Sequence, residues 1–291
     1  MQRYLCTICD KTFSSKRRPD KLLESIFKDY FYHRFTLTEL SKKYAYSREW
    51  IQDKVHHFSP KVNTRKPRAV TVVIDATYFG KRRDKLGLIV AKDVLLKEPI
   101  SYNFIVTETK DVYRDLIAQI YDKGFTLNAV VLDGKPGIIS LFEGIPLQMC
   151  HFHMKSIITR KLTRNPKLQA SIELKQIVSH LGKISACKFE YMLLAWYKRH
   201  ELFLNEKVSS ETKRGWHYKH KRLRSAHRSL TKFLPYLFTY QKYPYFSIPT
   251  TTNYLDGGCF SPLKDLLRVH RGIGVNMKRK LIVYFLENRV K

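Results

Sequence analysis

The stretch that decides the fold is Val70-Thr71-Val72-Val73-Ile74-Asp75-Ala76-Thr77-Tyr78-Phe79-Gly80, in which a run of β-branched apolar residues ends on a carboxylate. Branched side chains pack well on a pleated surface, so this run predicts a strand buried on both faces. A carboxylate at the end of a buried strand is costly to bury alone and needs a metal ion, a basic partner or water. Asp75 is therefore either part of a functional site or a solvated loop residue.

Composition points to a globular protein that binds a polyanion. The chain has 291 residues, of which 44% are hydrophobic, enough for one large domain or two smaller ones. The formal net charge of +29 favours nucleic acid as a partner over an anionic membrane surface. No apolar run approaches the roughly 20 residues that a membrane-spanning helix needs, and no signal-peptide core follows Met1. We therefore expect a nucleic-acid partner and no membrane partner.

The five cysteines are odd in number and mostly far apart, which predicts reduced thiols in a cytosol. Cys6 and Cys9 have the spacing of one zinc knuckle, whereas a closed structural zinc site needs four ligands. Residues 1–20 are thus expected to be the second half of a zinc ribbon whose first knuckle would precede Met1. Cys6 and Cys9 are candidate Zn²⁺ ligands, and the alternative is a pair of ordinary thiols.

Residues 21–58 predict three helices, because apolar residues recur at helical spacing and Thr36 begins a capping-box pattern. A short turn at 45–47 separates the last two helices, which is the layout of a helix-turn-helix. An ordinary small helical bundle is the alternative. Residues 59–69 are polar and basic, contain two prolines and predict a linker. The side chains available to a DNA groove are Arg48, Gln52, Lys54 and His56.

Residues 70–153 predict the first part of a mixed sheet. After the first strand, residues 86–94 and 100–106 are strand-like, with a connection short enough for an antiparallel pair. A helix and a second buried strand follow, and that strand ends on Asp133. The ends of two strands can therefore bring Asp75 and Asp133 together.

Cys150 and His153 close this region at a spacing that suits metal ligation. The alternative is a buried thiol beside a hydrogen-bonded histidine.

Residues 154–249 predict an all-helical insertion, since glycine becomes rare and apolar residues recur every three to four positions. Within it, residues 213–232 contain eight Lys or Arg and no acid, with aromatic residues interleaved. Such a stretch can neutralise phosphates while its rings stack on bases, and a solvated helix face is the alternative. The candidate DNA-binding residues here are Lys213, Arg214, Trp216, Lys219, Lys221, Arg222 and Arg224.

Residues 250–291 carry a third carboxylate, Asp256, on a glycine-rich entry to the last helices, which we expect to complete the core. Three carboxylates at two strand ends and one helix entry suit two-metal phosphoryl transfer. Hard oxygen ligands favour Mg²⁺ in such a site.

At this point the chain resembles the Mutator-like insertion-sequence transposases, which belong to the DDE superfamily with a ribonuclease-H-like core. The resemblance covers nearly the whole chain, and its segments fall in the family's order. They are Val73-Ile74-Asp75, Val131-Leu132-Asp133-Gly134, Cys150-His151-Phe152-His153, Thr251-Thr252-Asn253-Tyr254-Leu255-Asp256-Gly257 and Leu267-Arg268-Val269-His270-Arg271-Gly272.

The resemblance implies an α/β fold: a ribonuclease-H-like mixed sheet with an all-α insertion, preceded by a small helix-turn-helix-like domain. It implies a DNA transposase that cleaves and transfers strands, with two Mg²⁺ or Mn²⁺ ions held by the catalytic residues Asp75, Asp133 and Asp256. Cys150, His153 and Asn253 would lie next to the active site. The implied partners are terminal inverted repeats, target DNA and further copies of the chain, in a bacterial cytoplasm and near the nucleoid.

Two departures from the family pattern leave a rival interpretation. Position 256 is Asp where the family usually has Glu, and the zinc ribbon is shortened. A decayed or repurposed transposase that binds DNA without catalysis is therefore the main alternative. A structure-selective nuclease on the same fold is a third.

Overall fold

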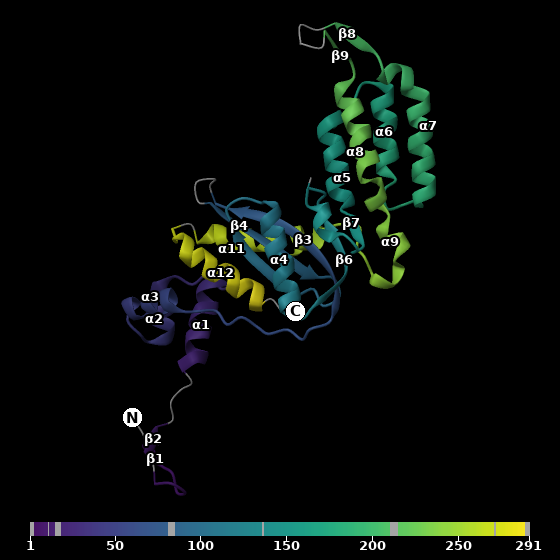
Figure 1. The fold of residues 1–291 in the computed structure, drawn as a ribbon. Helices are drawn as coiled ribbons and strands as arrows, with labels where there is room; N and C mark the ends of the chain where they lie inside the picture. Colours follow the sequence, from purple (N-terminus) through teal and green to yellow (C-terminus); the bar gives the residue numbers. More distant parts are fainter. Residues whose placement is uncertain are drawn as a thin grey trace. The chain divides into compact units, whose positions relative to one another are not determined.

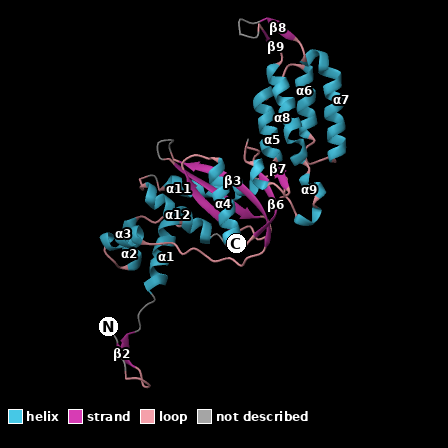
Figure 2. Ribbon diagram, viewed as in Figure 1, coloured by secondary structure: helices cyan, strands magenta, loops and turns pink. Residues whose placement is uncertain are grey.

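In the computed structural model, a five-stranded mixed sheet is the centre of the unit formed by Thr64–Ser261 (Figures 1 and 2). The structure describes residues 3–10, 12–14, 19–80, 85–135, 137–209, 215–270 and 272–288. The strands are β3 (Ala69–Phe79), β4 (Leu86–Asp93), β5 (Pro99–Ile105), β6 (Thr126–Leu132) and β7 (Leu147–Met149), in the order β5-β4-β3-β6-β7. β4 runs antiparallel to β3 and β5, whereas β6 and β7 continue the sheet in parallel. The predicted α/β fold with a mixed sheet is confirmed.

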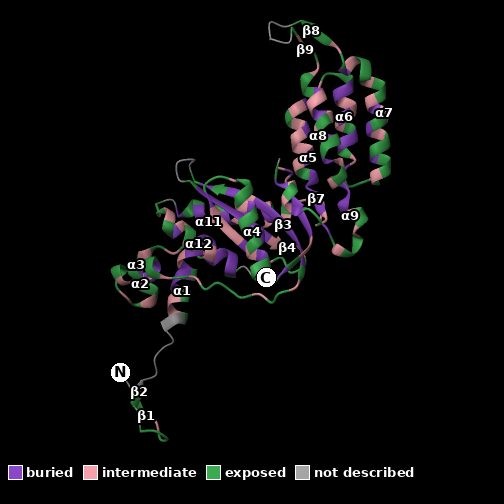
Figure 3. Ribbon diagram, in the orientation of Figure 1, coloured by how far each residue is buried: buried purple, intermediate pink, exposed green. Residues whose placement is uncertain are grey.

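β3 is buried as predicted, but it does not end at Asp75. Its residues 70–75 are all at most 7% exposed, and Figure 3 shows the centre of the sheet as buried. The strand continues to Phe79, which pairs with Leu86 of β4, because the residues after the acid are again good strand formers. Pairing with β6, in contrast, extends only to Val73 opposite Val131. The predicted strand end at Asp75 is therefore wrong: the acid lies inside β3, where the β6 side of the strand is no longer paired.

Helix α4 (Lys110–Asp122) covers one face of this sheet. It begins where the Thr109 side chain accepts a hydrogen bond from the Val112 backbone N–H, and Gly124 with φ +78° follows its end. Its buried face includes Tyr113 and Leu116, which share an apolar cluster with β3 and β6. The short helix η2 (Ile139–Phe142) adds to this cluster.

The insertion between β7 and residue 250 has a separate apolar core. Its helices are α5 (His151–Leu162), α6 (Gln169–Ser179), α7 (Ala186–Leu204), α8 (Lys221–Leu237) and α9 (Thr239–Lys242), followed by η3 (Pro244–Phe246). Trp196 and Phe189 are buried in this core with residues of α5, α6 and α8. The insertion is not all-helical, because β8 (Lys207–Ser209) and β9 (Trp216–Tyr218) form an antiparallel hairpin. The strands are three residues long, too short for a periodic signal in the sequence.

The other unit consists of Met1–Asn63 and Pro262–Lys291. It contains the hairpin of β1 (Arg3–Leu5) and β2 (Thr12–Ser14), the helices α1 (Pro19–Phe31), α2 (Leu37–Tyr44) and α3 (Arg48–His57), and α12 (Val275–Asn288). α11 (Ser261–Val269) starts at the boundary between the units. The Thr36 capping box begins α2 as predicted, and the Ser47 side chain caps the start of α3.

Residues 262–291 group with the first helices in one compact unit, whereas residues 250–261 group with the sheet. The ring of Tyr284 in α12 lies 5.0 Å from that of Phe27 in α1, and Glu287 accepts a hydrogen bond from the Asn63 backbone N–H. These contacts join residues more than 200 positions apart, so local sequence patterns could not reveal them. The predicted linker at 59–69 spans the boundary between the units, and Arg68 within it pairs with Asp93 and Glu98.

Candidate functional site

Asp75 carries a buried carboxylate oxygen that has no hydrogen-bond partner among the described residues. Its Oδ1 accepts a hydrogen bond of 2.8 Å from the Ala76 backbone N–H. Its Oδ2 is buried and unpaired. An unsatisfied buried oxygen is costly, and in a native protein it indicates a ligand or ion. This oxygen therefore marks Asp75 as a candidate metal ligand.

Asp256 lies at a junction between two kinds of helix. It follows the short helix α10 (Asn253–Leu255) and begins the π-helical turn η4 (Asp256–Phe260). Single π-helical turns occur frequently at functional sites. The predicted glycine-rich entry is thus already helical. Asn253, predicted to lie next to the active site, is exposed at the start of α10.

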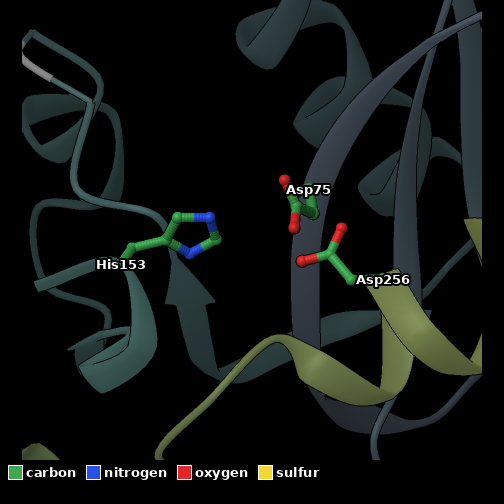
Figure 4. A group of neighbouring side chains, drawn as sticks. All are labelled: Asp75, His153 and Asp256. Carbon is green, nitrogen blue, oxygen red and sulfur yellow. The ribbon is translucent and has the colours of Figure 1, made fainter. Parts of the chain in front are cut away.

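Asp75, His153 and Asp256 form a compact group (Figure 4). One ligand atom from each residue can be chosen so that all three lie within 4.8 Å of one another. Two carboxylates and an imidazole form a mixed oxygen and nitrogen donor set. Mg²⁺ prefers oxygen ligands alone, whereas imidazole suits transition metals and carboxylate suits Mn²⁺. This group is a possible metal site, and its histidine makes the donor set less suited to Mg²⁺ than three carboxylates would be.

Asp133 lies beside this group but outside it. The last β3–β6 pair is Val73 with Val131, so Asp75 and Asp133 each follow two residues later. Burial raises the pKa of Asp133, and the nearby charge of Glu108 raises it further. The predicted set of three aspartates thus differs from the compact group, in which His153 occupies the third position.

The charged groups of this cluster shift one another's pKa values. Burial raises the pKa of Asp75 from 3.8 to about 7, and the charge of Asp256 adds to the effect. The hydrogen bond with Cys150 raises the pKa of His153 to about 9, and the charges of Asp75 and Asp133 also favour the imidazolium. The positive charge of a protonated His153 therefore offsets part of the negative charge of the carboxylates.

Glu108 is a fourth acid near the site that the sequence analysis missed. Its side chain accepts a 2.5 Å hydrogen bond from the hydroxyl of buried Tyr113 and lies 3.2 Å from the Lys135 amine. The Lys135 backbone N–H in turn donates to Asp133 Oδ1 at 3.3 Å. Glu108 thus fixes the loop that carries Asp133. The only signal in the sequence is an acid three residues after the end of β5.

Cys150 and Thr252 connect the segment that carries Asp256 to the sheet. The Cys150 backbone N–H donates to the Leu132 carbonyl at the end of β6, at 2.7 Å. Its thiol accepts a 3.3 Å hydrogen bond from the Thr252 backbone N–H. The Thr252 hydroxyl lies 3.6 Å from this thiol and 3.5 Å from His153 Nδ1. Because Cys150 and Thr252 are both 0% exposed, they hold the site together and cannot contact DNA.

Removal of the Thr252 hydroxyl is expected to weaken metal binding. Thr252→Val keeps the shape of the side chain but loses the contacts with Cys150 and His153, so His153 is less firmly oriented. Loss of a group that orients a ligand typically lowers metal affinity by about 10–100-fold. We expect calorimetric titration with Mn²⁺ to show a loss of this size for Thr252→Val and near-normal affinity for Thr252→Ser. Equal affinities for the two variants would contradict the assigned role.

Cys6 and Cys9 lie on the hairpin of β1 and β2, where the Asp10 backbone N–H donates to the Cys6 carbonyl. Hydrogen bonds from the backbone of Ile8 and Cys9 lower the pKa of the Cys6 thiol, as in a metal knuckle. Within the described part of the chain, no third potential ligand joins them. The zinc site stays a prediction.

The predicted recognition helix α3 has an exposed face of mixed charge. Arg48 and Gln52 are exposed there, but Glu49 and Asp53 are exposed on the same helix. Lys54 pairs with Asp53 at 2.9 Å and is only half-exposed. These acids reduce the attraction of α3 for DNA.

The aromatic residues predicted to stack on bases are partly covered by cations of the chain. Lys207 lies 4.2 Å from the centre of the Trp216 ring, and Arg224 lies 3.6 Å from that of Tyr218. Lys219 pairs with Glu206 at 2.9 Å, whereas Lys221 and Arg222 are exposed. The remaining two predicted DNA-binding residues, Lys213 and Arg214, lie outside the described residues.

Comparisons with known proteins leave the family open. No protein-family model matches the sequence, and no curated protein matches it. Among solved structures, the chain is similar to one in the simian T-cell lymphotropic virus intasome, determined by cryo-electron microscopy in complex with the PP2A regulatory subunit B56 gamma. The identity is 12% and the TM-score 0.24, over 68% of this chain and 73% of that chain. A TM-score this low carries no argument about function. Within the described residues, no helix is long and apolar enough to cross a membrane.

Proposed function

We propose that the chain is a metal-dependent DNA transposase of the Mutator-like type, with a ribonuclease-H-like catalytic core. The observation that carries this proposal is the group of Asp75, His153 and Asp256, in which a buried Asp75 oxygen has no partner among the described residues. The sheet, three antiparallel strands followed by two parallel ones, is compatible with such a core. The net charge of +29 fits a DNA substrate.

Asp75 and Asp256 would hold a first divalent ion together with His153, and Asp133 would contribute to a second. Bound ions would supply Lewis-acid activation of the attacking oxygen and neutralise charge on the leaving oxygen. The role of the chain is to fix its carboxylates in place before the substrate arrives. β3 and β6 position Asp75 and Asp133, and the contacts of Thr252 position the segment of Asp256. Catalysis would then rest on positioning and charge neutralisation.

Divalent-ion-dependent nicking of the DNA that flanks the coding sequence tests this proposal. We expect the full chain to nick a plasmid that carries this DNA in Mn²⁺. Asp256→Asn should lower the rate by about 10³-fold or more, because a metal contributes several kcal/mol to the transition state. DNA binding by this variant should persist. Asp115→Asn, which removes an exposed acid on α4, serves as the control and should nick normally.

The rival interpretation, a DNA-binding protein without catalysis, predicts a different result in the same assay. Asp256→Glu restores the longer side chain that the family usually has at this position. If neither the native chain nor Asp256→Glu nicks DNA in Mn²⁺ while both bind it, the transposase proposal fails. Preferred cleavage of branched DNA over linear repeat ends would instead indicate a structure-selective nuclease.

A further inference from the structure

The helical insertion contains a strongly basic cavity that is separate from the carboxylate site. The cavity measures about 610 Å³ and is formed by the end of α5, the loop after it, β9 and the start of α8. Its described lining includes Lys161, Lys167, Lys219, Lys221 and Arg222, and no Asp or Glu is among the described residues that line it. A concave surface of one charge sign concentrates ions of the opposite sign. The cavity therefore has the charge and shape of an anion site.

Most of this charge is not neutralised by the protein. Among the described residues, Lys219 alone of these five cations has a carboxylate partner, Glu206. Lys167 and Lys221 are exposed and have no ion pair there. An anion in the cavity would be attracted by several cations that have no carboxylate partner among the described residues.

Two cations of the cavity are held in fixed orientations. The Lys161 amine donates to the Ser225 hydroxyl, and Arg222 donates to the Arg160 carbonyl at 2.8 Å. These contacts leave the positive charge of both groups uncompensated. Fixed donors lose less conformational entropy when a ligand binds.

The wall of the cavity has one further feature that is common at ligand sites. Thr163 has φ +72° and ψ 171°, a backbone conformation that is essentially restricted to glycine. Local backbone strain of this kind clusters at ligand sites.

One face of each of two nearby aromatic rings is already covered by a cation of the chain. Arg224 covers one face of Tyr218 at 3.6 Å, and Lys207 covers one face of Trp216 at 4.2 Å. The free donors of the cavity are ammonium and guanidinium groups, which suit phosphate oxygens.

We propose that this cavity binds phosphates of the DNA backbone, so that the insertion holds DNA without regard to its sequence. The identity of the polyanion as DNA rests on the proposed function. The phosphate chemistry rests on the cavity alone.

Binding assays without divalent ions separate this inference from the catalytic proposal. The full chain and the double variant Lys167→Gln/Lys221→Gln are titrated into two fluorescent duplexes of unrelated sequence, in EDTA and at several salt concentrations. The control is Lys188→Gln/Lys198→Gln, which removes two exposed lysines of α7 outside the cavity. Thermal unfolding of each variant verifies that it is folded.

We expect the cavity variant to lose affinity on the order of tenfold for both duplexes. The slope of log affinity against log salt should fall by nearly two, since each phosphate contact contributes about 0.9. An unchanged slope, an equal loss in the control, or a loss for one duplex only would overturn the inference. Competition by inorganic phosphate as effective as by DNA would show a small-anion site, and stronger binding to anionic vesicles would show a membrane contact. Either result overturns the DNA assignment whether or not the chain cleaves DNA.

Discussion

Asn in place of Asp75 is expected to stabilise the metal-free protein at pH 8 by several kcal/mol and, in the same variant, to abolish metal-dependent DNA cleavage. The two effects have one cause. Burial and the charge of Asp256 raise the pKa of Asp75 from 3.8 to about 7, so the folded protein favours the neutral carboxyl. The unfolded chain ionises this group freely once the pH exceeds about 4. The folded state therefore loses stability as the pH rises from about 4 to 7.

The size of the stabilisation follows from this pKa difference. A difference of one pKa unit between the folded and the unfolded state corresponds to about 1.4 kcal/mol. The stabilisation expected for Asp75→Asn at pH 8 is therefore on the order of 4 kcal/mol. Asn has no charge at any pH, and its Oδ1 can still accept the hydrogen bond from the Ala76 backbone N–H. Urea unfolding in EDTA should thus give similar stabilities near pH 4 and a more stable variant at pH 8. A variant that is no more stable than the native chain at pH 8 would show that burial does not disfavour the ionised carboxylate of Asp75.

Added Mn²⁺ should narrow the difference in stability between the native chain and Asp75→Asn. A ligand that binds only the folded state stabilises it by about 2.7 kcal/mol at 100 times its dissociation constant. The native chain should gain stability of this size in Mn²⁺, whereas the stability of Asp75→Asn should hardly change. The variant should also fail to nick DNA. The exposed control Asp115→Asn should respond to Mn²⁺ as the native chain does.

The sequence predicted the elements that depend on local pattern. The apolar run at 70–74 forms a buried strand, and the second such run forms β6 next to it, so Asp75 and Asp133 are neighbours. The Thr36 capping box begins a helix as predicted, because capping is a property of four consecutive residues. These features need no knowledge of distant contacts.

The features that sequence could not predict depend on contacts across long separations. Cys150 and Thr252 are 102 positions apart, and only folding reveals that the thiol accepts a hydrogen bond from the Thr252 backbone. His153, which the sequence indicates as a candidate beside the active site, lies in the metal group, whereas Asp133 does not. The packing of Tyr284 on Phe27 is equally remote, and no local pattern indicates that α12 groups with α1.

Gly134, directly after Asp133, is expected to be among the least replaceable residues of the core. Its φ is +79°, which disfavours any residue with a Cβ atom. A Cβ here would also lie 2.1 Å from Met149 Sδ, and Met149 is 0% exposed at the edge of the helical core. Overpacking of a buried site costs about 1–3 kcal/mol, in addition to about 1 kcal/mol for the backbone.

Gly134→Ala should therefore destabilise the protein by about 2–4 kcal/mol. Gly137→Ala should cost only the roughly 1 kcal/mol that comes from the positive φ of the backbone. Gly137 is a matched control because its φ is +82° and a Cβ there would meet no atom within 4 Å. Urea unfolding of both variants isolates the steric cost as the difference between them. Met149→Ala in the Gly134→Ala background should recover part of that difference, since it removes the atoms in conflict. Equal losses for the two glycine variants would show that Met149 moves aside freely. If the Met149 side chain cannot move, the loop that carries Asp133 must shift. Gly134→Ala should then weaken Mn²⁺-dependent nicking, whereas Gly137→Ala should preserve it.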